Sequence, residues 1–162
     1  MRTLEGEELR EAKRFVEEAA EAAQESGCDD AWCGSVLIGG DEIIGKGWNS
    51  PPHDLESHRR CSNEKEEYDE RVTDKTCCVH AEQRAIMNAL GNYSKEKVKG
   101  SKLYFARVNE QGKVKKTNEP YCTICSKMIL DVGIEEVVMW NGEDLVAYPA
   151  EEYNDISFSY QG

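Results

Sequence analysis

Two short motifs far apart in the chain most constrain how it can fold. The first is CVHAEQ at residues 78–83, and the second is PYCTIC at residues 120–125; each opens a stretch with helical periodicity. One imidazole and two thiolates can supply three ligands of a tetrahedral zinc ion and leave the fourth position for a water molecule. A fold that builds this site must bring two helix starts together from distant parts of the chain.

Glu82 is the acidic residue of the first motif that need not bind the metal. It lies two residues after His80, so its side chain points along a different direction of the same helix. A carboxylate there can reach the zinc-bound water or a bound substrate and carry protons. Zinc lowers the pKa of its water from about 16 to about 7, whereas a structural zinc normally has a fourth protein ligand and no use for such a carboxylate. The two motifs therefore predict a hydrolytic zinc site.

Charge and cysteine content narrow the class of protein. The net charge of −12 argues against broad attraction to DNA, RNA or an anionic membrane, although a few local cations could still hold one phosphate. No apolar run approaches a membrane span, and the first residues, MRTLE, lack the apolar core of a signal peptide. Seven cysteines then favour metal binding or buried thiols over disulfides. We expect a single domain over residues 1–162, located in the cytoplasm.

The order of periodic segments predicts an α/β fold. The expected elements are a helix that ends by Gly27, a hairpin of strands at 32–38 and 41–48, a helix at 81–90, a strand at 102–108, a helix at 122–132 and a strand at 135–140. Helices that alternate with strands are typical of a sheet covered by helices. The aromatic tail after residue 141 is expected to pack over the domain edge or a subunit contact.

A long polar insertion at residues 53–76 interrupts this order. Such a connection inside a compact domain is usually functional or mobile. His58 and Cys61 have ligand-like spacing, and Cys77 or Cys78 could complete a second zinc site. The alternative is that these thiols are small buried hydrophobic groups, which is also the interpretation that we give to Cys28 and Cys33.

The HAE and CxxC motifs together resemble the zinc-dependent cytidine and deoxycytidylate deaminase superfamily. The resemblance extends from residue 32 to residue 140. It is greatest to deoxycytidylate deaminases, which share the His ligand, an Asn after the second strand and a polar insertion before the HAE helix. The resemblance implies a three-layer cytidine-deaminase-like fold, with a mixed central sheet of about five strands and helices on both faces. It also implies a homo-oligomer.

The same resemblance implies roles for individual residues. His80, Cys122 and Cys125 would bind zinc, and Glu82 would shuttle protons while zinc-bound hydroxide attacks C4 of a cytosine. The implied substrate is a small cytidine nucleotide or nucleoside, most readily dCMP, which would give dUMP and ammonia. The remaining implied contacts are those of Asn49 with the sugar and of the Ala81 backbone N–H with the pyrimidine carbonyl.

Several alternatives stay open at this stage. Asn49 could instead be an ordinary turn residue. Arg84, which lies where deoxycytidylate deaminases commonly carry Asn, could bind a phosphate or pair with an acidic neighbour. The same zinc site could serve a deaminase of cytosine, cytidine, guanine or another base, or it could stabilise a non-catalytic binding module.

Overall fold

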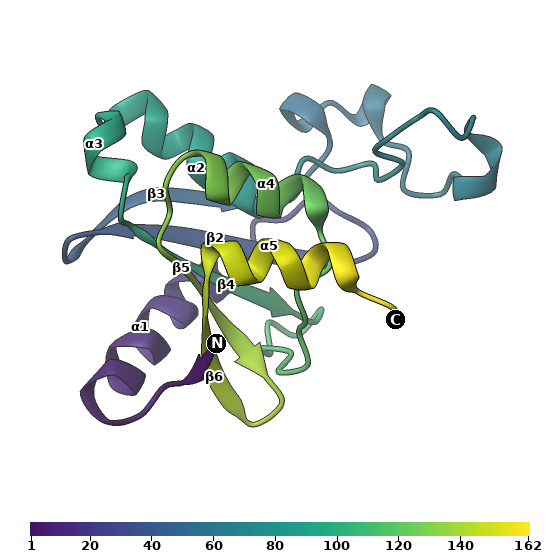
Figure 1. Ribbon diagram of the computed structural model, residues 1–162. Coiled ribbons are helices and arrows are strands. Elements are labelled where there is room, and N and C mark those ends of the chain that lie inside the picture. The colour runs from purple at the N-terminus through teal and green to yellow at the C-terminus, as the bar shows by residue number, and fades with distance from the viewer.

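A single six-stranded sheet organises the computed structural model, which describes residues 1–162 (Figure 1). The strand order is β1-β6-β5-β4-β2-β3. The strands are β1 (Arg2–Thr3), β2 (Trp32–Gly39), β3 (Glu42–Trp48), β4 (Lys102–Val108), β5 (Glu136–Asn141) and β6 (Asp144–Pro149). The α-helices are α1 (Gly6–Ala23), α2 (Ala81–Asn92), α3 (Lys95–Val98), α4 (Thr123–Asp131) and α5 (Ala150–Ser159). None of the helices combines the length and apolar character needed to cross a membrane.

The pairing of the strands confirms a mixed sheet. Strands β4 and β5 are parallel, with Lys102 opposite Glu136, and every other neighbouring pair is antiparallel. A parallel pair needs a crossover connection, and α4 lies in the crossover between β4 and β5. The sheet has six strands, one more than the five or so that the resemblance implies. Strand β1 has only two residues, and β6 lies in the segment after residue 141, which the sequence predicts to pack over the domain edge or a subunit contact.

Two apolar cores lie on the two faces of the sheet, as the alternation of side chains along β2 shows. Val36 and Ile38 pack with α1, whereas Leu37 between them packs with α2 and α4. Helix α1 thus covers one face, and α2, α4 and α5 cover the other (Figure 1). The expected three-layer arrangement with helices on both faces is confirmed.

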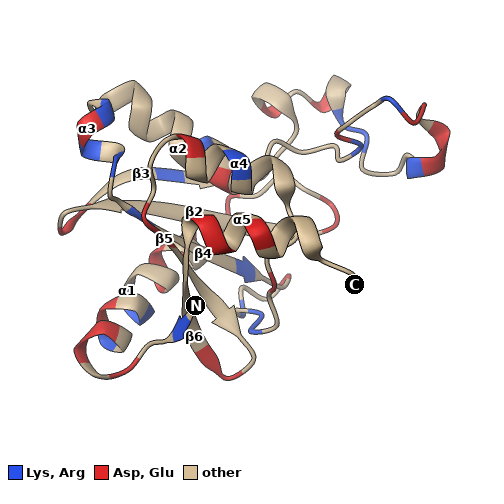
Figure 2. Cartoon of the chain, viewed as in Figure 1, with Lys and Arg blue, Asp and Glu red and all other residues tan.

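The insertion at residues 53–76 contains neither a strand nor an α-helix. Its only regular structure is three short 3-10 turns at Pro52–Asp54, Glu56–His58 and Lys65–Glu67. In Figure 1 it projects to one side of the layered body, and Figure 2 shows acidic and basic residues along it. With few apolar groups to bury, this segment depends on specific polar contacts for its position.

Two glycines of β3 allow helix α2 to lie directly on the sheet. A Cβ atom on Gly47 would lie 2.4 Å from the Ala81 carbonyl oxygen and 2.5 Å from the Ala85 nitrogen. A Cβ atom on Gly45 would lie 2.3 Å from the carbonyl oxygen of Ala85. Both contacts are with the helix backbone, which cannot move aside as a flexible side chain can. The absence of these two side chains therefore sets how closely the start of α2 approaches the sheet.

We expect Gly47→Ala to destabilise the protein by about 1–3 kcal/mol, because the added methyl group must push α2 away from β3. The matched control is Gly91→Ala near the end of α2, where an added Cβ meets nothing within 4 Å. That change should be neutral or stabilising by up to about 1 kcal/mol, since Ala is the better helix former. Chemical unfolding of both variants measures the difference. Equal stability of the two variants would contradict this account of the packing.

Candidate active site

The two motifs meet because two helices begin at the same place. Helix α2 starts directly after His80 and α4 starts directly after Cys122. The His80 N–H donates a hydrogen bond to Gln83 Oε1 at 3.0 Å, which is one half of a capping box. Cys122 Sγ accepts from the Cys125 N–H at 3.5 Å. The positive ends of both helix dipoles therefore point toward one small region, where they favour thiolates.

His80, Cys122 and Cys125 form a group whose ligand atoms all lie within 4.8 Å of one another. His80 Nδ1 lies 3.1 Å from Cys125 Sγ and 3.3 Å from Cys122 Sγ. In a tetrahedral zinc site, bonds of about 2.0 Å to nitrogen and 2.3 Å to sulfur place N and S about 3.5 Å apart. The observed separations are close to this value, so the three residues fit a zinc ion with little movement.

Hydrogen bonds among the three ligands shift their pKa values. The pKa of Cys122 falls to about 4, because its thiolate accepts hydrogen bonds from Cys125 and His80. The pKa of His80 rises to about 9, mainly through its hydrogen bond to Cys122. That of Cys125 rises well above its usual range, because it serves as the donor to Cys122. Without metal, the group is a thiolate held by one imidazolium and one thiol.

The other ring nitrogen of His80 also has a partner. Its Nε2 lies 3.1 Å from Thr76 Oγ1, whose hydroxyl also contacts Asp74. A ligating His normally donates its second N–H to such an oxygen, and this orients the ring toward the metal. Thr76 ends the polar insertion, so the insertion contributes directly to the metal site. The sequence does not predict the contact between Thr76 and the His80 ring.

Glu82 is the carboxylate beside this group. It is 8% exposed, and its Oε2 lies 3.6 Å from Cys125 Sγ. Burial raises the pKa of Glu82 above its usual value. The side chain thus lies next to the candidate metal position and is better able to exchange a proton near neutral pH than an exposed glutamate.

A cavity of about 720 Å³ opens in front of these residues. This volume is within the range of small-molecule sites in proteins. Its wall includes His80, Ala81, Glu82, Cys122 and Asn49. The insertion, the end of β4, the loop before α4 and the C-terminal segment contribute further lining residues, which include Arg60, Lys65, Arg107, Tyr121, Tyr153 and Tyr160. Part of the aromatic tail therefore lines the cavity and does more than cover the domain edge.

Asn49 and Ala81 both lie at this cavity. Asn49 is buried, and its Oδ1 accepts from the Cys33 N–H at 2.9 Å and from Ser26 Oγ at 2.6 Å. Its Nδ2 donates to the Ala31 carbonyl at 2.7 Å, which leaves one amide hydrogen for another acceptor. Ala81 is the first residue of α2, so its N–H has no acceptor within the helix. Both groups are available for a ligand, and Asn49 also holds the 26–33 loop.

Arg84 is directed into the protein and does not line the cavity. Its guanidinium donates to the Trp48 carbonyl at 3.2 Å and the Pro51 carbonyl at 3.0 Å, and it contacts Ser50. Asp54 completes its surroundings at 3.9 Å. Of the two interpretations from the sequence, the structure favours pairing within the protein. Arg84 fastens the exit of β3 to α2.

The structure brings together only part of the second zinc site predicted from the sequence: Cys61 lies close to Cys78, whereas His58 does not join them. His58 is exposed, and its Nδ1 lies 3.5 Å from Arg60 Nη2. Cys77 Sγ accepts from the Arg60 N–H at 2.8 Å. Cys61 instead lies with Cys28 and Cys78 in a second group of close ligand atoms. The sequence predicts Cys28 to be a small buried hydrophobic group. Residue spacing does not reveal its proximity to the insertion, which depends on the tertiary structure.

The fold and the His/Cys/Cys group beside a buried carboxylate define a zinc-binding α/β protein. The family described as the cytidine and deoxycytidylate deaminase zinc-binding region matches residues 9–141, and the chain belongs to this family. The comparison thus confirms the resemblance seen in the two motifs.

The individual relatives described next have low sequence identity to this chain. A deoxycytidylate deaminase of Schizosaccharomyces pombe is 26% identical over 141 residues, which are 84% of this chain and 38% of that protein. The chain therefore spans well under half the length of that relative. The dCMP deaminase of cyanophage S-TIM5, solved in complex with dCMP and dUMP, is 24% identical with a TM-score of 0.55, over 83% of this chain and 82% of that one. A cytidine deaminase from Burkholderia pseudomallei is 17% identical with a TM-score of 0.58, over 87% and 94%. Both structures confirm the cytidine-deaminase-like fold.

The protonation of the three candidate ligands predicts that zinc binding depends on pH. Zinc takes a neutral imidazole and thiolates, so it must displace the protons of His80, whose pKa is about 9, and of Cys125. Cys122 is already ionised above about pH 4. As the pH falls from about 8 to about 6, the apparent zinc affinity should fall by about two log units per pH unit. Chelator competition on metal-free protein measures this, and an affinity independent of pH would contradict the assignment.

Proposed function

We propose that the chain is a zinc-dependent deaminase that hydrolyses the amino group of a cytidine nucleotide, with dCMP as the preferred substrate. The observation that carries this proposal is the position of buried Glu82 beside the His80, Cys122 and Cys125 group, at the wall of a cavity large enough for a nucleotide. The proposed products are the uracil nucleotide and ammonia. Membership of the deaminase family supports the reaction type.

The three candidate ligands and Glu82 have separate roles in this proposal. His80, Cys122 and Cys125 would hold the zinc ion, which when bound supplies the Lewis acidity that activates water at neutral pH. Glu82 takes a proton from the attacking water and delivers it to N3 of the cytosine ring. It then takes the second proton of the same water, which is now on the hydroxyl group at C4, and passes it to the amino group, which leaves as ammonia. Overall one water adds at C4 and one ammonia leaves, so no other reactant is needed.

Two polar groups at the cavity wall would orient the substrate. The Ala81 N–H lies at the positive end of α2 and can donate to the pyrimidine carbonyl. The remaining amide hydrogen of Asn49 can donate to a sugar hydroxyl. Because Asn49 also bonds to the 26–33 loop, its donor direction is set before the substrate binds. Such preorganisation lowers the entropic cost of binding.

We expect Glu82→Gln to lower turnover by roughly 100- to 10,000-fold, because the amide has the same shape but cannot accept and return a proton. Zinc content and the unfolding midpoint should change little. Glu96→Gln, the same change at an exposed site on α3, is the control and should keep full activity. Ammonia release from dCMP measures both variants. Unchanged turnover in Glu82→Gln would favour the non-catalytic binding module.

Arg107 is the feature that favours a nucleotide over a nucleoside. It lies on β4, is half-buried and lines the cavity. Its Nε atom is buried without a hydrogen-bond partner, and the residue takes part in no ion pair. A guanidinium group in this state is well suited to accept a phosphate, which can satisfy two of its N–H donors at once. The named substrate of the S. pombe relative and the dCMP bound to the phage enzyme are consistent with this choice.

We expect Arg107→Gln to lower kcat/KM for dCMP by about 10- to 100-fold, as loss of a hydrogen bond between charged groups would. Activity on deoxycytidine should stay the same, because that substrate has no phosphate. Lys113→Gln removes an exposed cation outside the cavity and should affect neither substrate. An equal loss on dCMP and deoxycytidine would contradict the role of Arg107. Absence of wild-type activity on every cytosine compound would overturn the substrate assignment itself.

A further inference from the structure

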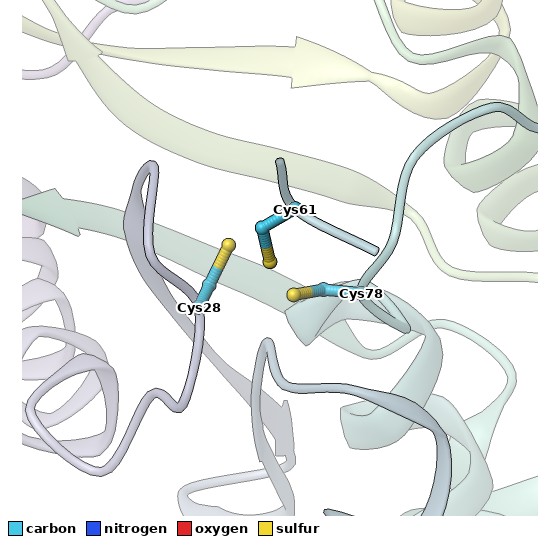
Figure 3. Close-up of side chains that lie close together, drawn as sticks. All are labelled: Cys28, Cys61 and Cys78. Carbon is cyan, nitrogen blue, oxygen red and sulfur yellow. The ribbon is translucent and has the colours of Figure 1, made fainter. Parts of the chain in front are cut away.

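Three cysteines outside the candidate active site converge on one point (Figure 3). They are Cys28 after α1, Cys61 in the polar insertion and Cys78 just before α2. Their sulfur atoms all lie within 4.8 Å of one another. The close-up shows the three side chains directed toward a common centre from three separate stretches of backbone. We propose that Cys28, Cys61 and Cys78 bind a second zinc ion, which fastens the insertion to the body of the protein.

The chemistry of the group favours a metal over a disulfide. Two thiolates on one tetrahedral zinc lie about 3.8 Å apart, since each Zn–S bond is about 2.3 Å long. The sulfur separations are compatible with this value after small movements. A disulfide could join only two of the three cysteines and would leave the third unpaired in the same place. Three thiolates from three segments form instead most of the ligand set of a structural zinc site.

Polar neighbours of Cys61 support the charge that such a site carries. Arg59 Nη1 lies 3.7 Å from Cys61 Sγ and is fixed by the Gly27 carbonyl at 2.6 Å and by Asp29 at 3.2 Å. A guanidinium group held beside a thiolate stabilises the negative charge, as the outer contacts of metal ligands commonly do. Arg59 belongs to the insertion, whereas Gly27 and Asp29 flank Cys28. The same contacts therefore bring the insertion to the first ligand.

Cys77 provides a further sulfur next to the group. Its thiol lies beside those of Cys61 and Cys78. The Arg60 N–H at 2.8 Å already directs a hydrogen bond to it. Cys77 is therefore the nearest candidate for a fourth ligand, and its sulfur lies outside the group of three whose atoms are all within 4.8 Å of one another.

The second zinc ion would order one wall of the active-site cavity. The insertion has no α-helix or strand of its own, yet its residues Arg60, Asn63 and Lys65 line the cavity together with Cys61. Cys78 lies two residues before His80, so the same ion also holds the backbone that leads into the first zinc site. This role depends on thiol geometry alone and does not require that the proposed deamination is correct.

Metal analysis of the purified protein tests this inference. Protein expressed with zinc and purified under a reductant should contain two zinc ions per chain. Cys28→Ser and Cys61→Ser should each contain one, and so should Cys122→Ser, which removes a ligand of the other site. Cys33→Ser is the matched control, because Cys33 lines the same cavity but belongs to neither group, and it should keep two. One zinc ion per wild-type chain, with no loss in Cys28→Ser, would overturn the proposal.

A second measurement covers the possibility that the cysteine variants fold poorly. In Cys122→Ser the proposed second site is intact, so Co²⁺ should give strong sulfur-to-metal charge-transfer absorption, and zinc should protect the insertion from trypsin compared with chelator-treated protein. Lys65 and Arg71 are the cleavage sites to follow. Weak absorption, or cleavage that is the same with and without zinc, would contradict a metal-held insertion. Alkylation of fewer than seven thiols in denatured, metal-free wild-type protein would indicate a disulfide instead.

Discussion

The convergence of two helix N-termini is the constraint on which the rest of the structure depends. His80 caps α2 and Cys122 caps α4, so the positions of the candidate metal ligands follow from the packing of these helices on one face of the sheet. Gly45 and Gly47 set how closely α2 approaches β3. Ile129 of α4 is buried in the apolar core on the same face of the sheet. The parallel pairing of β4 and β5 places the crossover so that α4 starts where α2 starts. A local motif becomes a site only through this arrangement.

Charge is distributed in a way that the net value of −12 does not reveal. Figure 2 shows acidic residues along α1. The cavity wall carries both signs of charge, with the basic residues Arg60, Lys65, Lys75 and Arg107 and the acidic residues Asp30, Asp74, Glu82 and Glu119. Arg59 contacts one thiol group, and Arg107 lies at the cavity without an ion-pair partner. Near Arg107 an anionic ligand can therefore be attracted locally, although the protein as a whole is negatively charged.

The sequence predicts those features that depend on local chemistry. The ligand spacing of the CxxC motif, the alternation along β2 and the helical periods were all readable, because each results from neighbouring residues. The β5–β6 hairpin was also visible in principle, since Asn141-Gly142 between apolar runs is a strong turn signal, and Gly142 does adopt a positive φ of 69°. Gln83, three residues after His80, likewise has the spacing of a helix cap. The sequence predictions include neither the β5–β6 hairpin nor the Gln83 cap, although local residue patterns indicate both.

Other features arise only from tertiary contacts. Cys28 and Cys61 are separated by the first hairpin, and their proximity depends on how the insertion folds back on the end of α1. The hydrogen bonds of Arg84 to carbonyl groups and the isolation of Arg107 are likewise invisible in the sequence, where both are simply cations. The segment from Thr76 to His80 connects these observations. Thr76 contacts the His80 ring, Cys78 belongs to the thiol group, and the Val79 N–H bonds to the Ser50 carbonyl at 2.9 Å. Because neighbouring residues of this segment are held by different parts of the molecule, a displacement of the insertion would be transmitted to the imidazole that the zinc ion requires.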